Sequence, residues 1–131
     1  MPEPITDISL DGFKSALENL EPNKIIILRF TAEWCGPCKH IDPICTAYFE
    51  QCSPDIQPIV VDVDETIDLY MQYKRYKMLN GIPAIFAYYG NERQDQDPSK
   101  WYIPNDSVNT GDNAQVMEFF NRCSMHINKQ K

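Results

Sequence analysis

Basic residues are scarce in this chain of 131 residues, which has 12 Lys and Arg against 19 Asp and Glu and a formal net charge of −7. Binding to nucleic acid or to an anionic membrane needs a basic patch, so this charge balance is unfavourable for both roles. The apolar runs are also shorter than the roughly 20 residues that a membrane-spanning helix requires. We therefore expect neither a nucleic-acid partner nor a membrane association.

A secretory signal is a second feature that the sequence lacks. Residues 1–7, MPEPITD, contain neither the basic stretch nor the apolar core of such a signal. The chain has five cysteines, an odd number, whereas a secreted disulfide framework favours even pairing. We therefore expect the cytoplasm or another reducing compartment, where a Cys-X-X-Cys motif is more often catalytic than structural.

The chain also lacks internal repeats and any linker that would divide it, so we predict a single domain over residues 1–131. Apolar residues at offsets of three and four predict amphipathic helices, and short runs rich in Ile and Val predict buried strands. Four helices are predicted. They span residues 11–20 (with Asp11 as N-cap), from the cysteine motif to about residue 52, about 67–77, and from 112 to about 127. The predicted strands are 5–9, 25–31, 59–63, 85–89 and 101–103, and the polar segment 91–100 is expected to be a solvated loop. This alternation indicates an α/β fold, with strands 25–31 and 59–63 parallel because a helix connects them.

Two cysteines separated by Gly36 and Pro37 stand where a predicted strand meets a predicted helix. In the first turn of a helix, unpaired backbone N–H groups and the positive end of the dipole favour a thiolate. Gly36 permits a tight turn, and Pro37 fits a position where a backbone N–H has no partner. Cys35 is the candidate nucleophile for attack on a target disulfide. Cys38 lies three positions on, within disulfide reach, and would resolve the mixed disulfide.

Residues 34–39, WCGPCK, closely resemble the active site of the thioredoxin family, and residues 81–84, GIPA, resemble its cis-proline loop. Pro43 matches the proline that kinks the family's active-site helix. The resemblance covers roughly residues 5–123. It implies a thioredoxin fold, with a central mixed sheet flanked by helices, and the activity of a protein-disulfide reductase. Such a protein needs no bound metal or organic cofactor beyond its redox-active disulfide, and its electrons come from an upstream NADPH-dependent reductase.

The same resemblance implies roles for the residues around the thiols. Cys35 would be partly exposed and Cys38 more buried. With a cis bond before Pro83, the backbone of Ile82 would offer hydrogen bonds to an extended substrate, whereas the alternative for this proline is a simple turn. Trp34 would flank the thiols as a contact surface, and its alternative is a core aromatic.

Arg29 departs from the family, which usually carries a buried Asp at this position. A guanidinium stays protonated, so Arg29 cannot act as a base near neutral pH. Pointing toward Cys38, it would stabilise a thiolate and make the couple more oxidising. Paired with Asp62 or Asp64, it would be a structural ion pair. Both interpretations remain open, and Lys39 is a second candidate for redox tuning.

The remaining cysteines, Cys45, Cys52 and Cys123, lie on apolar helix stripes and are expected to pack as small core residues. Their alternatives are regulatory oxidation and dimer formation, but we expect a monomer. A zinc site needs four ligands, and only one cysteine pair has metal-like spacing.

Two other classes of function remain as alternatives to the reductase. One is an interaction module for a particular partner with little or no redox turnover, which Arg29 and the long loop 91–100 favour. The other is a disulfide oxidase or isomerase, which Gly-Pro between the cysteines and the missing signal disfavour.

Overall fold

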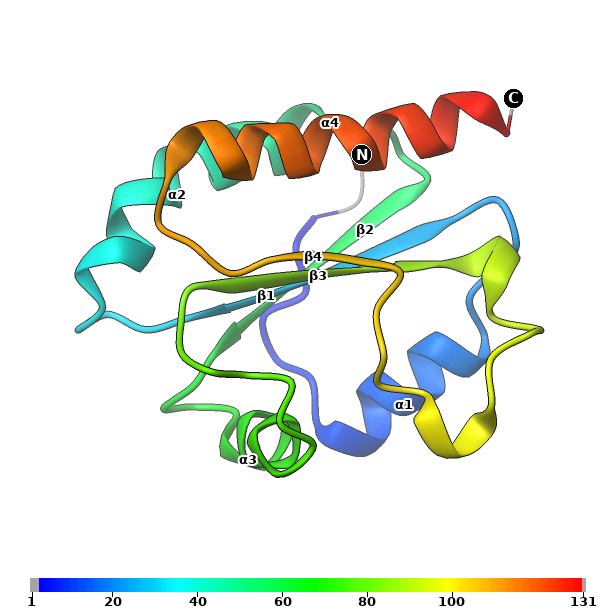
Figure 1. Cartoon of the computed structure of the whole chain (residues 1–131), viewed down its shortest axis with the longest axis horizontal. Coiled ribbons are helices and arrows are strands. Elements are labelled where there is room, and N and C mark those ends of the chain that lie inside the picture. The colour runs from blue at the N-terminus through cyan, green and yellow to red at the C-terminus, as the bar shows by residue number, and fades with distance from the viewer. Residues whose placement is uncertain (1–2, 131) are drawn as a thin grey trace.

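The computed structural model describes residues 3–130, and within them a four-stranded sheet lies between two layers of helices (Figure 1). Helices α2 and α4 cover one face, and α1 and α3 cover the other. The predicted domain also includes residues 1, 2 and 131, which lie outside the described part. The elements are α1 (Leu10–Glu18), β1 (Ile25–Thr31), α2 (Gly36–Gln51), β2 (Ile56–Asp62), α3 (Ile67–Arg75), β3 (Ala84–Tyr89), β4 (Asp106–Val108) and α4 (Asn113–Lys129).

The strand order is β2-β1-β3-β4, with β1 parallel to β2 and antiparallel to β3. The predicted bounds of β1 and its parallel pairing with β2 are therefore confirmed. Strand β1 is buried along nearly its whole length, as its run of Ile and Leu predicts for a strand covered on both faces. Because β1 is central and rigid, it holds in place the turn that carries the cysteines.

A hydrophobic core lies on each face of the sheet. One core joins the sheet to α2 and α4 through residues such as Ile41 and Phe119, and the other joins it to α1 and α3 around Phe13 and Tyr73. Among residues 3–130, no helix is long enough and apolar enough to cross a membrane.

The three additional cysteines are core residues, as expected. Cys45, Cys52 and Cys123 are unpaired and buried in the core beneath α2 and α4. Burial raises the pKa of Cys45 to about 11 and the pKa of Cys123 to about 12, because a thiolate is poorly solvated there. These thiols stay protonated at neutral pH.

The prediction of an edge strand at 101–103 is wrong, since the edge strand is β4. Trp101 lies with its ring 6.2 Å from that of Phe13, and Tyr102 stacks on Tyr76 at 3.7 Å. Large aromatic rings bury more area in such a cluster than at a sheet edge, so this segment packs beneath α1 and α3 instead of pairing with β3. The preceding loop, 91–100, includes a short 3-10 turn at Pro98–Lys100 and the end of another at Gly90–Glu92.

Several element ends differ from the prediction. Residues 5–9 form only a single parallel bridge, between Ile5 and Ile59. The N-cap of α1 is Ser9, whose hydroxyl accepts the backbone N–H of Gly12, and not Asp11. Strand β2 begins at Ile56 and includes Pro58, which is tolerated because β2 lies at the end of the sheet order.

Candidate functional site

The two sulfurs of the Cys-X-X-Cys motif lie at the N-terminus of α2. Cys35 is the N-cap, and its Sγ accepts a hydrogen bond of 3.2 Å from the backbone N–H of Cys38. A disulfide joins the two residues, whose Cα atoms are 5.2 Å apart. After reduction, the N–H group that now points at Cys35 Sγ would stabilise a thiolate on that sulfur.

The burial of the two sulfurs is stronger than the resemblance implies. Cys38 is fully buried, and Cys35 is only 5% exposed. The cause is the loop on the far side of the disulfide, where the carbonyl oxygen of Ile82 lies 3.8 Å from Cys35 Sγ. Cys35 is therefore less exposed than the resemblance implies, although it remains more exposed than Cys38.

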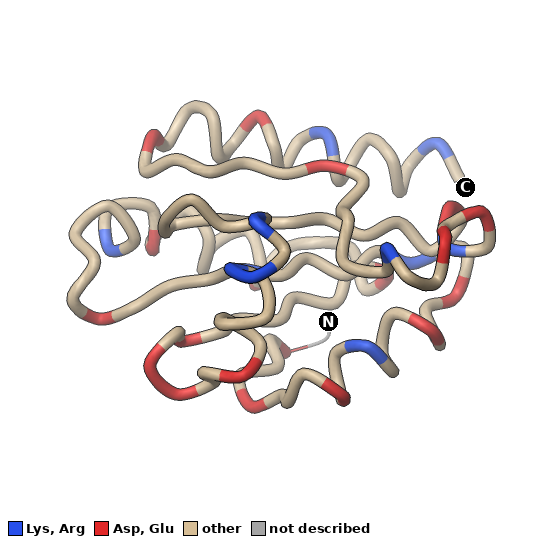
Figure 2. The backbone as a smooth tube through the Cα atoms, turned by 60° about the horizontal axis from the view of Figure 1, so that its bottom comes forward, with Lys and Arg blue, Asp and Glu red and all other residues tan. Residues whose placement is uncertain are grey.

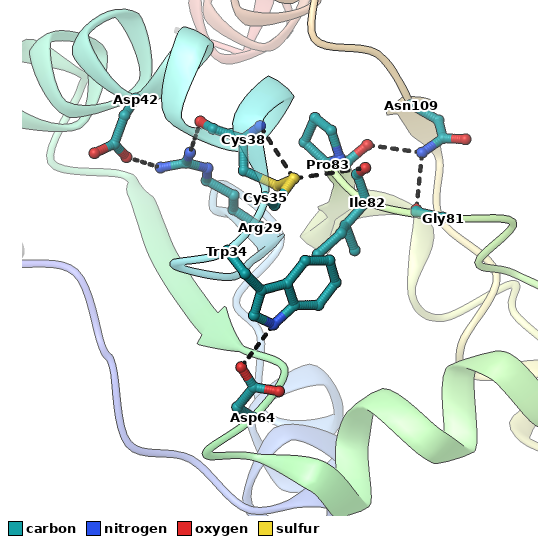
Figure 3. The surroundings of a disulfide bond; sticks show 10 residues. All are labelled: Arg29, Trp34, Cys35, Cys38, Asp42, Asp64, Gly81, Ile82, Pro83 and Asn109. Atoms are coloured by element: carbon teal, nitrogen blue, oxygen red, sulfur yellow. Dashed lines mark hydrogen bonds and ion pairs between the residues drawn. A yellow bond between two sulfur atoms is a disulfide. The ribbon is translucent and has the colours of Figure 1, made fainter.

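The peptide bond between Ile82 and Pro83 is cis, so Pro83 is not a simple turn proline. Figure 3 shows this loop facing the disulfide across the site. The backbone of Ile82 lies beside Cys35, where an extended segment of another chain could pair with it and bring a disulfide to the sulfur.

Asn109 holds this cis-proline loop in place and was not among the residues predicted from the sequence. Its Nδ2 group donates to the carbonyl oxygens of Gly81, at 3.1 Å, and Pro83, at 2.7 Å. Asn109 directly follows β4, so its position depends on the pairing of β3 with β4. Its local sequence does not distinguish it from any other loop asparagine, because both partners lie more than 25 residues away.

Trp34 is 66% exposed and flanks the disulfide, which rules out a core aromatic at this position. Its indole Nε1 donates a 2.8 Å hydrogen bond to the carboxylate of Asp64 (Figure 3). Asp64 belongs to an acidic segment, visible as a red cluster at the lower left of Figure 2, that joins β2 to α3. The acidic residues of this segment and the first turn of α3 are Asp62, Asp64, Glu65 and Asp68.

Arg29 pairs with neither of the carboxylates proposed from the sequence. Its Nη1 lies 2.7 Å from Oδ1 of Asp42, and its Nη2 donates to the carbonyl oxygen of Cys38 at 3.0 Å. Side chains alternate along β1, and Arg29 points to the face that α2 covers. There α2 presents Asp42 one turn after Cys38, whereas Asp62 and Asp64 lie at and beyond the end of β2.

Comparison with known proteins shows the family to which the chain belongs. The thioredoxin family model matches residues 5–100. The chain belongs to the thioredoxin family. It is 32% identical over 91 residues to a thioredoxin of Rickettsia typhi, a match that covers 70% of this chain and 78% of that protein.

Another similar thioredoxin, thioredoxin H8 of Arabidopsis thaliana, is 32% identical over 78 residues, which are 59% of this chain. The match covers about half of the curated relative, at 49% of its length. Among solved structures, a thioredoxin of Malassezia sympodialis superposes with a TM-score of 0.67 at 21% identity, covering 95% of this chain and 93% of that one. A thioredoxin of Fasciola hepatica superposes with a TM-score of 0.66 at 18% identity, and the match covers 90% of this chain and 97% of that one. These structural matches confirm the predicted thioredoxin fold.

Gly111 is a further residue of the thioredoxin site that sequence reasoning missed. A Cβ atom at this position would lie 2.7 Å from Cβ of Pro37, closer than real Cβ contacts come. The backbone of the loop between β4 and α4 therefore packs directly against the Cys-Gly-Pro-Cys turn, with no side chain between them. A glycine two residues after Asn109 has no local signature of this role, because Pro37, against which it packs, is far away in the sequence.

Lys39 lines a cavity of about 190 Å³ beside the thioredoxin disulfide, together with Cys38, Asp42 and Asp62. No hydrogen bond links Lys39 to either sulfur among the described contacts of residues 3–130. Within that same range, no group of three or more His, Cys, Asp or Glu residues is placed to hold a metal ion. The redox-active group that the structure shows at this site is the Cys35–Cys38 disulfide.

Proposed function

We propose that this protein is a protein-disulfide reductase that works by dithiol–disulfide exchange. The observation that carries the proposal is Cys35 at the N-cap of α2, with the N–H of Cys38 3.2 Å from its sulfur. A hydrogen bond to the charged form and the helix dipole both favour a Cys35 thiolate. The thiolate is the nucleophilic form of a cysteine.

The reaction has two displacements. The Cys35 thiolate attacks one sulfur of the target disulfide, forming a mixed disulfide, and the second target sulfur leaves with the electron pair and takes up a proton. Cys38, as a thiolate, then attacks Cys35 Sγ. The bond between Cys35 and the target breaks, the remaining target sulfur leaves with its electron pair, and the Cys35–Cys38 disulfide forms.

The residues around the sulfurs would bind and orient the target. The backbone of Ile82, positioned by Pro83, would pair with an extended target segment, and exposed Trp34 would contact its side chains. Gly36 and Pro37 would shape the turn against which that segment lies. Arg29 and Lys39 would tune the redox chemistry, Arg29 through its contact with Cys38.

The remaining parts of the proposal concern the setting of the protein. It would act as a monomeric single domain, without nucleic acid or membrane, in the cytoplasm or another reducing compartment. No bound metal or organic cofactor would be needed. An upstream NADPH-dependent reductase would reduce the Cys35–Cys38 disulfide, so that the protein carries electrons in cell redox homeostasis. The interaction module without turnover gains no support from the site, whose two sulfurs are already joined.

Insulin reduction with dithiothreitol as the electron source tests this proposal. The wild-type protein should accelerate the precipitation of the reduced insulin B chain, and Cys35→Ser should abolish the acceleration. Reduced Cys38→Ser, freed of dithiothreitol before insulin is added, should retain the first displacement and accumulate a mixed disulfide, visible as a covalent adduct by mass spectrometry. A wild-type rate no higher than that of Cys35→Ser would remove the reductase and leave the interaction module.

A further inference from the structure

The resolving cysteine poses an electrostatic problem that the fold has to solve. Cys38 has no exposed surface, and burial disfavours a thiolate. Yet Cys38 must ionise before it can attack the mixed disulfide. Its own backbone N–H points at Cys35 Sγ and so does not stabilise the sulfur of Cys38.

The nearest buried charge is the guanidinium of Arg29. Figure 3 shows it beneath α2, between the carbonyl of Cys38 and the carboxylate of Asp42. The side chain of Arg29 is 4% exposed, whereas that of Asp42 is 60% exposed. Water therefore screens the negative charge of Asp42 more than the positive charge of Arg29. The pair presents a net positive field to the interior, where Cys38 lies.

Asp42 also has a direct geometric relation to Cys38. The two residues line the cavity of about 190 Å³ beside the disulfide. The other ionisable side chains around this cavity are Glu33, Lys39 and Asp62. From the opposite side, the cis-proline loop at Ile82 and Pro83 contributes no ionisable group.

Cys45, on the same helix, responds to both charges. Its pKa is raised chiefly by burial, but Arg29 lowers that pKa and Asp42 raises it. The two members of the ion pair thus act with opposite signs on a buried sulfur of α2. The backbone carbonyl of Cys38 accepts a hydrogen bond from Arg29, which places the guanidinium against the turn of α2 that carries this cysteine.

We propose that Arg29 and Asp42 together set the stability of the Cys38 thiolate, with Asp42 as the positioning residue. Its carboxylate holds the guanidinium beneath Cys38 and cancels part of the positive charge that the sulfur would otherwise experience. The inference rests on the exchange reaction proposed above. In the mixed disulfide Cys38 loses its proton to solvent, and its thiolate then displaces the target sulfur from Cys35, which leaves with its electron pair.

The test is the equilibrium of the Cys35–Cys38 couple with reduced and oxidised glutathione, measured in the full-length protein. Asp42→Asn keeps an oxygen that can accept from Arg29 Nη1 but removes the negative charge. It should stabilise the thiolate and therefore the reduced form, shifting the equilibrium about threefold toward the dithiol. Arg29→Gln removes the positive charge and should shift the equilibrium about tenfold toward the disulfide.

The opposite signs distinguish this inference from a merely structural role. Loss of packing would weaken the site in both variants alike, whereas a charge balance moves the couple in opposite directions. The pH profile of the resolving step, followed by stopped-flow release of a thiol target, should move to lower pH in Asp42→Asn and to higher pH in Arg29→Gln. Glu50→Gln is the matched control, because it removes one exposed negative charge from the same helix.

Asp42→Asn decides the question even if Arg29→Gln does not fold, since Asp42 is largely exposed. An unchanged equilibrium, or a shift toward the disulfide, would overturn the inference. A shift in Glu50→Gln as large as that in Asp42→Asn would also overturn it, since the effect would then be one of net charge. If Asp62→Asn moved the couple more than Asp42→Asn, the controlling carboxylate would be Asp62 and the inference would be wrong.

This measurement does not depend on insulin reduction. A glutathione equilibrium that shifts as expected, in a protein without insulin reductase activity, would support the charge balance and reject the proposed function. Full reductase activity, with a glutathione equilibrium that Asp42→Asn does not shift, would support the proposed function and reject the charge balance.

Discussion

The indole N–H of Trp34 donates to the carboxylate of Asp64 across 30 residues of sequence, at 2.8 Å. This bond ties the exposed ring beside the disulfide to the acidic loop that precedes α3. The ring gains a fixed orientation without being buried, because its polar atom has a partner and its faces stay open. The exposed ring beside Cys35 is therefore held by a loop that contributes nothing to the cysteine motif itself.

Replacing Asp64 by Ala should free the indole and lower kcat/KM for insulin about threefold to tenfold, as expected when a hydrogen bond worth about 1 kcal/mol is lost. The unfolding free energy should fall by at most that same ~1 kcal/mol, because the bond joins two exposed side chains and no packing is lost. Insulin reduction kinetics measure kcat/KM, and intrinsic Trp fluorescence during unfolding measures the free energy of unfolding. Glu65→Ala removes the same charge from the same loop. If it slowed the reaction equally, the local charge rather than the bond to Trp34 would be responsible.

Asn109→Asp should release the cis-proline loop. The carboxylate has the size of the amide but no donor, and it would face the carbonyl oxygens of Gly81 and Pro83. Loss of the two bonds should cost about 1–3 kcal/mol in urea unfolding and raise KM for a disulfide peptide. Asn105→Ala is the comparison, because Asn105 holds the backbone N–H of Tyr89 at the other end of β3. It should cost stability and leave KM unchanged, and an equal rise in KM would contradict a local role for Asn109.

Alkylation of the reduced protein should separate the five cysteines. Burial raises the pKa of Cys45 to about 11 and of Cys123 to about 12, from an ordinary value of 9.0. Both are therefore neutral and shielded at pH 8, and iodoacetamide should label Cys35 first by mass spectrometry. In urea all five should react. Rapid labelling of Cys45 or Cys123 in the folded state would show that this core opens.

The same shifts predict a loss of stability in alkali. Above about pH 9 these two cysteines ionise in the unfolded chain but stay protonated in the folded one, so the unfolded state binds fewer protons. The unfolding free energy should fall as pH rises from about 9 through 11. Cys45→Ala should reduce the slope of that fall in urea titrations, and an unaltered slope would contradict the raised pKa.

The local parts of this protein could be read from the amino-acid order. The run Ile25–Leu28 is apolar because β1 is covered on both faces, and Gly36 and Pro37 suit the first turn of α2 whatever surrounds it. Interactions within a few residues decide such features, and the cysteine motif is of this kind. The pairing of Cys35 with Cys38 was therefore predictable from the sequence.

Only the tertiary structure decided which distant residues surround the disulfide. Arg29 meets Asp42 because β1 turns this side chain toward α2, and Asn109 meets Gly81 because β4 pairs with β3. Trp101 packs with Phe13 instead of extending the sheet, since the burial of large rings there outweighs strand pairing. These contacts join residues that are far apart in the chain, and their partners are selected by packing and charge after the sheet has formed. Local propensity carries no information about them.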